Sequence, residues 1–323
     1  MTEAHLEVFR ALLDPIDGFD NVVGSVAADP PLTEPRLLFL RMHVDEPEVH
    51  SLVELLTALL VDYVVPLAKR QKANATGVAS RTGGSTFAHG RLTLEARRIL
   101  VKFEDETKSR YGELGELLSY AIAVHYLGAA QIGSRMALKT SAGMPVHGVD
   151  GLHVLANEDG TVTFFLLESK LVPSAADASR DMVASVAEYR ASRGRKLNEL
   201  RLASDFSNFE VLHGEQREAA KSFFNDYAGG GNHLLRRDVH VGSLVYEEEA
   251  YSEKIPLDRT KGITIHEDYF KALYAGKHQR FKENLQRQAK AKGLELGHCE
   301  VFMIAVPNID ELKRLFAQLN PRA

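Results

Sequence analysis

Two strand-like runs joined by a short turn constrain the fold of this chain most. The runs cover residues 150–157 and 161–171, and residues 158–160 connect them. A three-residue connection that ends in a glycine, here Gly160, suits a type I turn followed by a left-handed residue. The sequence therefore predicts a β-hairpin in the middle of the chain.

The register of this hairpin brings two carboxylates together. Counting back from a three-residue loop sets Asp150 opposite Glu168, with side-chain bases roughly 5 Å apart. Lys170 shares a face with Glu168, because side chains two apart in a strand point the same way. Neighbouring carboxylates repel each other unless a cation or a proton lies between them. The pattern predicts a divalent metal site with a lysine beside it.

Carboxylate oxygens are hard ligands, which favours Mg²⁺ at such a site, with Mn²⁺ as the alternative. These ions keep coordination positions for water and phosphate oxygens. The point charge of Lys170 is suited to orient an attacking water and to stabilise negative charge developing on phosphorus. In the simpler alternative, Glu168 and Lys170 form an exposed hairpin end and Asp150 is a turn residue.

A helical run ahead of the hairpin offers a third carboxylate. Glu113 and Glu116 lie three residues apart, on one side of that helix. We favour Glu116, because it lies deeper in the apolar stretch, where an unpaired carboxylate is costly. Both residues could instead be solvated glutamates of a first helical turn, favoured by the helix dipole. The choice between Glu113 and Glu116 stays open.

Other polar groups near the hairpin are weaker candidates. His147 lies in the loop before Asp150, and Lys139 could approach from the preceding run. His153 alternates away from Asp150 along the strand, so we expect it to pack or to meet solvent. The glycine-rich run 228–232 lacks the GxxxxGK[ST] pattern of a phosphate loop and is typical of a flexible connection.

Strand-like and helical runs alternate along the rest of the chain. Strands are expected at residues 36–44, 239–246 and 300–306, and helices at about 46–60, 177–202, 269–292 and 309–319. This pattern predicts an α/β or mixed α+β fold. We expect residues 1–90 to form an N-terminal α/β extension and candidate partner-binding region, which ends in a loop at 74–90. Residues 91–323 would form the catalytic domain.

The composition limits how this protein can bind nucleic acid. The chain has 323 residues, 45% hydrophobic and 26% charged, which is ordinary for a soluble globular protein. A formal net charge of −5 argues against binding by bulk electrostatics, so local basic patches or a partner subunit must supply the attraction. The Lys and Arg residues between Lys271 and Lys292 are either a solvated helix face or the best local candidate for a DNA or partner contact.

The cellular location follows from simple absences in the sequence. Cys299 is the single cysteine, and it lies in an apolar run where a packed thiol is expected. The first residues lack a basic segment followed by an apolar one, and no apolar run approaches the roughly 18 residues of a membrane span. We expect a cytoplasmic protein that does not contact a membrane.

The segments that carry these carboxylates resemble a known superfamily. Residues 115–118 with Glu116, residues 148–153 with Asp150, and residues 165–170 look like the helix glutamate, the aspartate and the ExK element of the PD-(D/E)xK nucleases. Within that superfamily the chain is similar to the HamA family, the nuclease subunits of the Hachiman anti-phage defence system. The resemblance is most specific over residues 110–172. Val149 stands where the superfamily motif has proline, which removes no ligand.

The resemblance implies a restriction-endonuclease-like core and Mg²⁺-dependent DNA endonuclease activity, with an ATP-dependent, HamB-like helicase subunit as partner. Carried onto this chain, Glu116, Asp150 and Glu168 become metal ligands and Lys170 the catalytic lysine. One rival is a catalytically silent nuclease fold that binds DNA or the helicase as a scaffold, against which the intact carboxylates and lysine argue. Another is a different hydrolase, which would lack a recognisable nucleophile motif such as GxSxG.

Overall fold

The structure is a computed structural model, and it describes residues 3–27, 34–80, 82–107, 112–134, 136, 149–192, 194, 208–212, 214–223, 235–253 and 260–321. Its contacts divide the chain into two compact units. Unit 1 comprises residues 1–15, 58–167 and 189–239, and unit 2 comprises residues 16–57, 168–188 and 240–323. The expected extension over residues 1–90 contributes to both units, and its role in partner binding stays a prediction.

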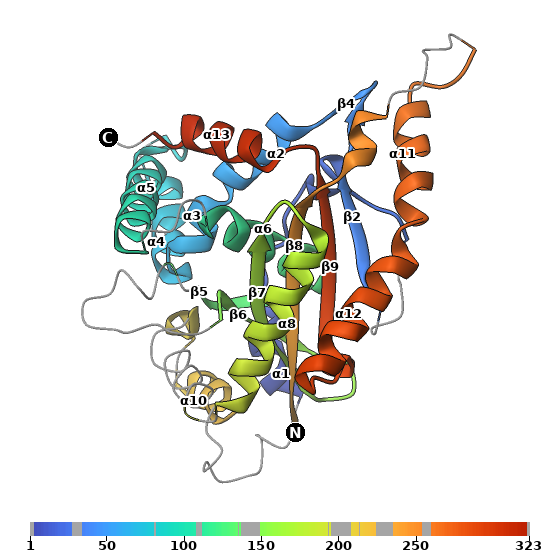
Figure 1. Ribbon diagram of the computed structural model, residues 1–323. Coiled ribbons are helices and arrows are strands. Elements are labelled where there is room, and N and C mark those ends of the chain that lie inside the picture. Colours follow the sequence, from blue (N-terminus) through green and yellow to red (C-terminus); the bar gives the residue numbers. More distant parts are fainter. Residues whose placement is uncertain are drawn as a thin grey trace. The chain divides into compact units, whose positions relative to one another are not determined.

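The described strands form a mixed sheet in the order β1-β2-β9-β8-β7-β6-β5 (Figure 1). Their bounds are β1 Val23–Ser25, β2 Arg36–Leu40, β5 Ala130–Ser134, β6 Gly151–Ala156, β7 Val162–Leu171, β8 Arg236–Glu247 and β9 Cys299–Val306. Strand β9 is parallel to both β2 and β8, whereas β1–β2, β5–β6 and β6–β7 are antiparallel. A separate two-stranded ribbon pairs β3 (Met42–His43) with β4 (Glu46–Pro47). The predicted α/β, mixed α+β fold class is confirmed.

Helices connect and cover these strands. Their bounds are α1 Glu3–Arg10, α2 Val49–Ala58, α3 Leu60–Val64, α4 Leu67–Val78, α5 Phe87–Thr107, α6 Gly112–Leu127, α8 Ala175–Ala191, α10 Glu215–Ser222, α11 Ile265–Ala275, α12 His278–Lys292 and α13 Ile309–Leu319. The strands near residues 239–246 and 300–306 and the helix at 309–319 are confirmed. The expected loop at 74–90 is wrong at both ends, since α4 continues to Val78 and α5 begins at Phe87.

Three other boundaries differ from the sequence expectation. The strand expected at 36–44 ends at Leu40, and the helix expected from 46 begins at Val49, because residues 46–47 belong to the small ribbon. The basic helical region at 269–292 is two helices, which meet around Gly276. The helix expected at 177–202 begins at Ala175 and ends at Ala191, so its expected end is wrong.

The predicted hairpin is confirmed in turn and register. Strands β6 and β7 pair from Gly151 opposite Leu167 to Ala156 opposite Val162. The Asn157 amide donates to the Thr161 carbonyl at 2.9 Å, and Gly160 adopts a left-handed φ of 83°. A side chain at that position would be strained, which explains why the turn ends in glycine.

One face of this hairpin forms the core of unit 1. Alternate residues of each strand point to the same face, so the even-numbered positions are buried together. The cluster includes Leu152, Val154, Ala156, Val162, Phe164 and Leu166, with residues of α1, α10 and β5. Phe9 of α1 packs edge-to-face against Phe209 and Phe223, with ring centroids 6.0 and 5.5 Å apart. These contacts fix the hairpin that carries the candidate site.

In unit 2, buried tyrosines join the parallel strands. The Tyr251 hydroxyl accepts a hydrogen bond from the Leu40 amide of β2 at 2.8 Å and lies 3.2 Å from the Ala305 carbonyl of β9. Its ring stacks on Phe270 of α11 at a centroid distance of 4.1 Å. Tyr274, also in α11, donates to the Met303 carbonyl of β9 at 2.7 Å. Helix α11 is therefore bound to this sheet by rings and by hydroxyls.

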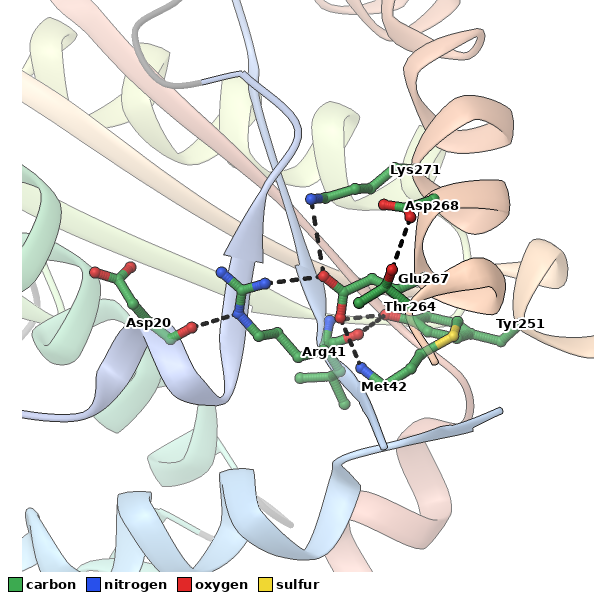
Figure 2. A network of polar contacts seen from close by, with 9 residues as sticks. Asp20, Arg41, Met42, Tyr251, Thr264, Glu267, Asp268 and Lys271 are labelled. Atoms are coloured by element: carbon green, nitrogen blue, oxygen red, sulfur yellow. Dashed lines mark hydrogen bonds and ion pairs between the residues drawn. The ribbon is translucent and has the colours of Figure 1, made fainter. Parts of the chain in front are cut away.

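A polar cluster holds the end of β2 against the start of α11 (Figure 2). The Glu267 carboxylate accepts from the Arg41 guanidinium at 2.8 Å and from the Met42 amide at 3.0 Å, and Lys271 lies 3.7 Å away. Arg41 also donates to the Asp20 carbonyl. Glu267 is buried, so these donors satisfy a charge that would otherwise be costly.

Candidate active site

Helix α6 buries a carboxylate in unit 1. Residues 113–124 of this helix are all buried, and Glu116 is only 4% exposed. A carboxylate in such an environment needs a hydrogen-bond or cationic partner, since its desolvation is costly. The hydroxyl of Tyr63, a buried residue of α3, donates to Glu116 Oε2 at 2.8 Å.

Tyr63 also reaches the residue that opens the hairpin. Its hydroxyl oxygen lies 3.4 Å from the backbone carbonyl of Asp150, which is itself 6% exposed. A hydroxyl has one proton, so the shorter contact to Glu116 takes it and the second contact is weak. The structure thus brings Glu116 and Asp150 together around one tyrosine.

Sequence reasoning missed Tyr63. The available signal was its spacing from Leu59 and Leu60, which continues an apolar helical stripe, together with the need of a buried tyrosine hydroxyl for a partner. Its backbone carbonyl accepts from Gln131 Nε2 of β5 at 3.2 Å. The carbonyl of Gln131 in turn accepts from Asn208 Nδ2 at 2.9 Å. Tyr63 is therefore held on its backbone side as well.

Strand β7 carries the other two predicted residues into unit 2. Lys170 Nζ lies 2.6 Å from Glu168 Oε1, and the two side chains are 23% and 15% exposed. This contact agrees with the prediction that both side chains share a face. A lysine within salt-bridge distance stabilises a half-buried carboxylate in the absence of a metal ion.

The hairpin ladder ends just before these residues. Gly151 is opposite Leu167, and the Asp150 amide donates to the Leu167 carbonyl at 2.8 Å. Asp150 precedes the first paired residue of β6, and Glu168 follows the last paired residue of β7. The structure thus pairs Glu168 with Lys170, and Tyr63 contacts both the Glu116 carboxylate and the Asp150 backbone carbonyl.

The donor chemistry fits a hard divalent cation. Glu116 and Asp150 supply carboxylate oxygens from buried positions, and such oxygens are the ligands that Mg²⁺ and Mn²⁺ prefer. In the part of the chain that is described, no three His, Cys, Asp or Glu side chains gather closely enough to form a ready metal site. The metal-ligand role of Glu116, Asp150 and Glu168 stays a prediction.

The structure describes some of the other residues considered in the sequence, and others lie outside its described part. Glu113 is 0% exposed, so both helix glutamates are buried and the solvated alternative is wrong. His153 is buried and its Nδ1 lies 3.0 Å from the Ala129 carbonyl, which confirms that it packs. Cys299 is a buried free thiol, as expected. His147, Lys139 and the glycine-rich run lie outside the described residues.

Comparison with protein-family models gives one match, to the family described as HamA, over residues 19–319. The chain belongs to the HamA family. The match covers the segments with Tyr63, Glu116, Asp150, Glu168 and Lys170, and it makes the protein a component of the Hachiman anti-phage defence system. No curated protein matches the chain. In the described residues of this HamA family member, no helix is long and apolar enough to cross a membrane.

Burial of His153 predicts a loss of stability in acid. Burial lowers the pKa of His153 to about 4 from 6.5, although its hydrogen bond to Ala129 opposes the shift. His153 therefore binds a proton below about pH 6.5 in the unfolded chain, but only below about pH 4 in the folded chain. We expect unfolding free energy to fall across this window, by on the order of 3 kcal/mol from this group.

Chemical denaturation between pH 7 and pH 4 measures this effect. His153→Gln should flatten the pH dependence, whereas His298→Gln, a change at an exposed histidine, should leave it as in the wild type. An equal slope in all three proteins would show that His153 is not the group responsible.

The hydrogen bond between Tyr63 and Glu116 predicts an energetic coupling. Tyr63→Phe removes the donor and leaves a buried carboxylate with one partner fewer, so we expect a loss of about 1 to 3 kcal/mol of unfolding free energy. In a Glu116→Gln background the same change should cost less. Tyr120→Phe is the matched control, because Tyr120 is a buried residue whose ring centroid lies 5.5 Å from that of Tyr63, and its hydroxyl makes no hydrogen bond to a described residue. Additive effects of Tyr63→Phe and Glu116→Gln would contradict the interaction.

Proposed function

We propose that this HamA family protein is a metal-dependent DNA endonuclease that acts with an ATP-dependent helicase subunit in Hachiman defence. The observation that carries the proposal is the Tyr63 hydroxyl, which donates to the buried Glu116 carboxylate and lies 3.4 Å from the backbone carbonyl of the buried Asp150. Glu168 and Lys170 follow directly after the ladder that begins beside Asp150. Family membership supplies the biological setting.

In this proposal Glu116, Asp150 and Glu168 hold one or two Mg²⁺ ions, or Mn²⁺. The bound cation would supply a Lewis acid for the phosphate and a more acidic water. Tyr63 keeps Glu116 in a fixed rotamer through its donated hydrogen bond. The ammonium of Lys170 orients the attacking water and offsets negative charge on the phosphodiester as the P–O bond to the leaving oxygen breaks.

The rival is a nuclease fold that serves as a silent scaffold for DNA or for the helicase. Buried charge argues for the catalytic function, because a scaffold gains nothing from carboxylates whose desolvation destabilises the fold. A scaffold would tolerate neutral replacements at these positions, and a nuclease would not. The two functions are therefore separable by conservative substitution.

Asp150→Asn and Glu168→Gln should each lower DNA cleavage at least about a hundredfold, because an amide keeps the volume of the side chain and loses the charge that binds the cation. Cleavage of linear and supercoiled DNA by the purified complex, with assembly checked by gel filtration, is the measurement. Chelation by EDTA should abolish the wild-type activity, and Mg²⁺ or Mn²⁺ should restore it. Glu158→Gln, in the exposed hairpin turn, is the matched control. Wild-type rates in both site variants would refute the proposal.

Replacement of Lys170 should lower turnover without lowering the affinity for the metal ion. An ammonium has no lone pair for a cation, so Lys170→Met should leave Mg²⁺ affinity in place, or raise it by removing a competing positive charge beside Glu168. Cleavage should fall by about a hundredfold or more, since the charge on the reacting phosphate is no longer offset. Calorimetry without DNA measures the first quantity and the cleavage assay the second. Loss of metal binding together with retained cleavage would reverse the assigned role.

A further inference from the structure

Helices α4 and α5 of unit 1 lie side by side (Figure 1). Their side chains line a groove of about 660 Å³. The floor is made of small or buried side chains, among them Ala73, Ala88 and Leu92. Gly77 lets the loop before α5 approach α4, since a Cβ on Gly77 would lie 2.8 Å from the Ser85 carbonyl oxygen. The floor is hollow because large side chains stand only at its edges.

Two large apolar side chains at the edge of this groove are exposed to solvent. Phe87 is 74% exposed and Leu94 is 55% exposed, and both line the groove. Exposed side chains of this size gain free energy when a partner covers them, at roughly 25 cal/mol per Å² of apolar area. Their position beside an apolar floor indicates a surface that is covered in the functional complex.

The rim of the groove is positively charged. Lys69, Lys72, Arg91 and Arg98 line it and are all exposed, against a single acidic residue, Glu95. Lys69 lies 2.5 Å from Glu95, and this pair bridges the two helices. Within the described residues, the other three cations make no ion pair. In a chain with a formal net charge of −5, this concentration of uncompensated positive charge indicates an acidic occupant.

The spacing of the rim residues favours a helix as that occupant. Lys69, Lys72 and Thr76 recur at three- and four-residue intervals on α4, as do Arg91, Leu94 and Arg98 on α5. Each series follows its helix axis for two turns, or about 10 Å. A partly apolar groove with two cations from each helix complements an amphipathic helix with carboxylates on both flanks of its apolar stripe.

Single-stranded DNA is the competing occupant, and the groove suits it less well. Such strands bind where successive aromatic side chains stack on their bases. Phe87 is the one aromatic residue that lines this groove, and the remaining apolar lining is aliphatic. We propose that the groove between α4 and α5 docks an acidic amphipathic helix of a partner protein.

A synthetic helical peptide tests this proposal without any assumption about catalysis. The probe is a fluorescent peptide of about 18 residues, with leucines along one stripe and glutamates on both flanks. A second peptide carries lysines in place of the glutamates, and a fluorescent single-stranded oligonucleotide is the third probe. Anisotropy with the full-length chain should show the acidic peptide binding at least about tenfold more tightly than the basic one, and losing affinity as salt is raised.

Substitutions on the rim then locate the site. Lys72→Glu with Arg91→Glu should weaken binding of the acidic peptide at least about tenfold, and Leu94→Ser should weaken it about fivefold through lost apolar burial. The matched controls are Lys261→Glu with Arg314→Glu, both exposed and outside the run from Lys271 to Lys292, and Ile263→Ser, which alters a side chain that is 81% exposed. These controls should bind within about twofold of the wild type.

Three results would overturn the proposal. The first is no saturable binding of the acidic peptide up to about 1 mM. The second is equal binding of the acidic and basic peptides, or equal losses in the rim and control variants. The third is tighter binding of the oligonucleotide, lost on reversal of Lys72 and Arg91, which would assign the groove to nucleic acid instead.

Discussion

The hydrogen bond from Tyr63 to Glu116 is the interaction on which unit 1 depends at the candidate site. Helix α6 is buried over nearly its whole length, so a carboxylate within it has no access to bulk water. A buried acceptor left without a donor costs about 1 to 3 kcal/mol, and more when it is charged. The hydroxyl supplies one such donor and also lies 3.4 Å from the Asp150 carbonyl, at the residue before β6. A single side chain thus connects α3, α6 and the start of β6.

Local features of the site were predictable, and distant ones were not. Residues 158–160 dictate the turn, and the register follows by counting, because both depend on neighbours in the chain. The same counting sets Asp150 opposite Glu168, yet the regular ladder ends at Gly151 and the Asp150 amide turns to the Leu167 carbonyl. Tyr63 lies 53 residues before Glu116, and no periodic pattern encodes a contact over that separation. The burial of both Glu113 and Glu116 could not be predicted from the sequence. It depends on how the rest of unit 1 packs around α6, whose residues 113–124 are all buried.

A run of the sequence that is rich in Lys and Arg does not always present unpaired positive charge on the folded protein. The run between Lys271 and Lys292 is the most obviously basic one, and the sequence makes it the best local candidate for binding DNA or a partner. In unit 2, however, Lys277 pairs with the buried Glu248, and Lys282 pairs with Glu34. Part of the positive charge of this run is therefore neutralised by acidic residues of the same unit. Helices α4 and α5 are less basic in sequence, but the groove between them collects cations that no described residue neutralises.

Strand β7 offers both a packed scaffold and partly exposed side chains. Its first six residues are buried, and its last four, beginning with Glu168, are only half-buried. A catalytic group must be fixed by a packed scaffold and must also reach water and substrate. The buried half of β7 supplies the first condition through the core that contains Phe164, and the half-buried end supplies the second. Lys170 balances the charge of Glu168, so a lysine proposed to act in turnover also stabilises a carboxylate proposed as a metal ligand.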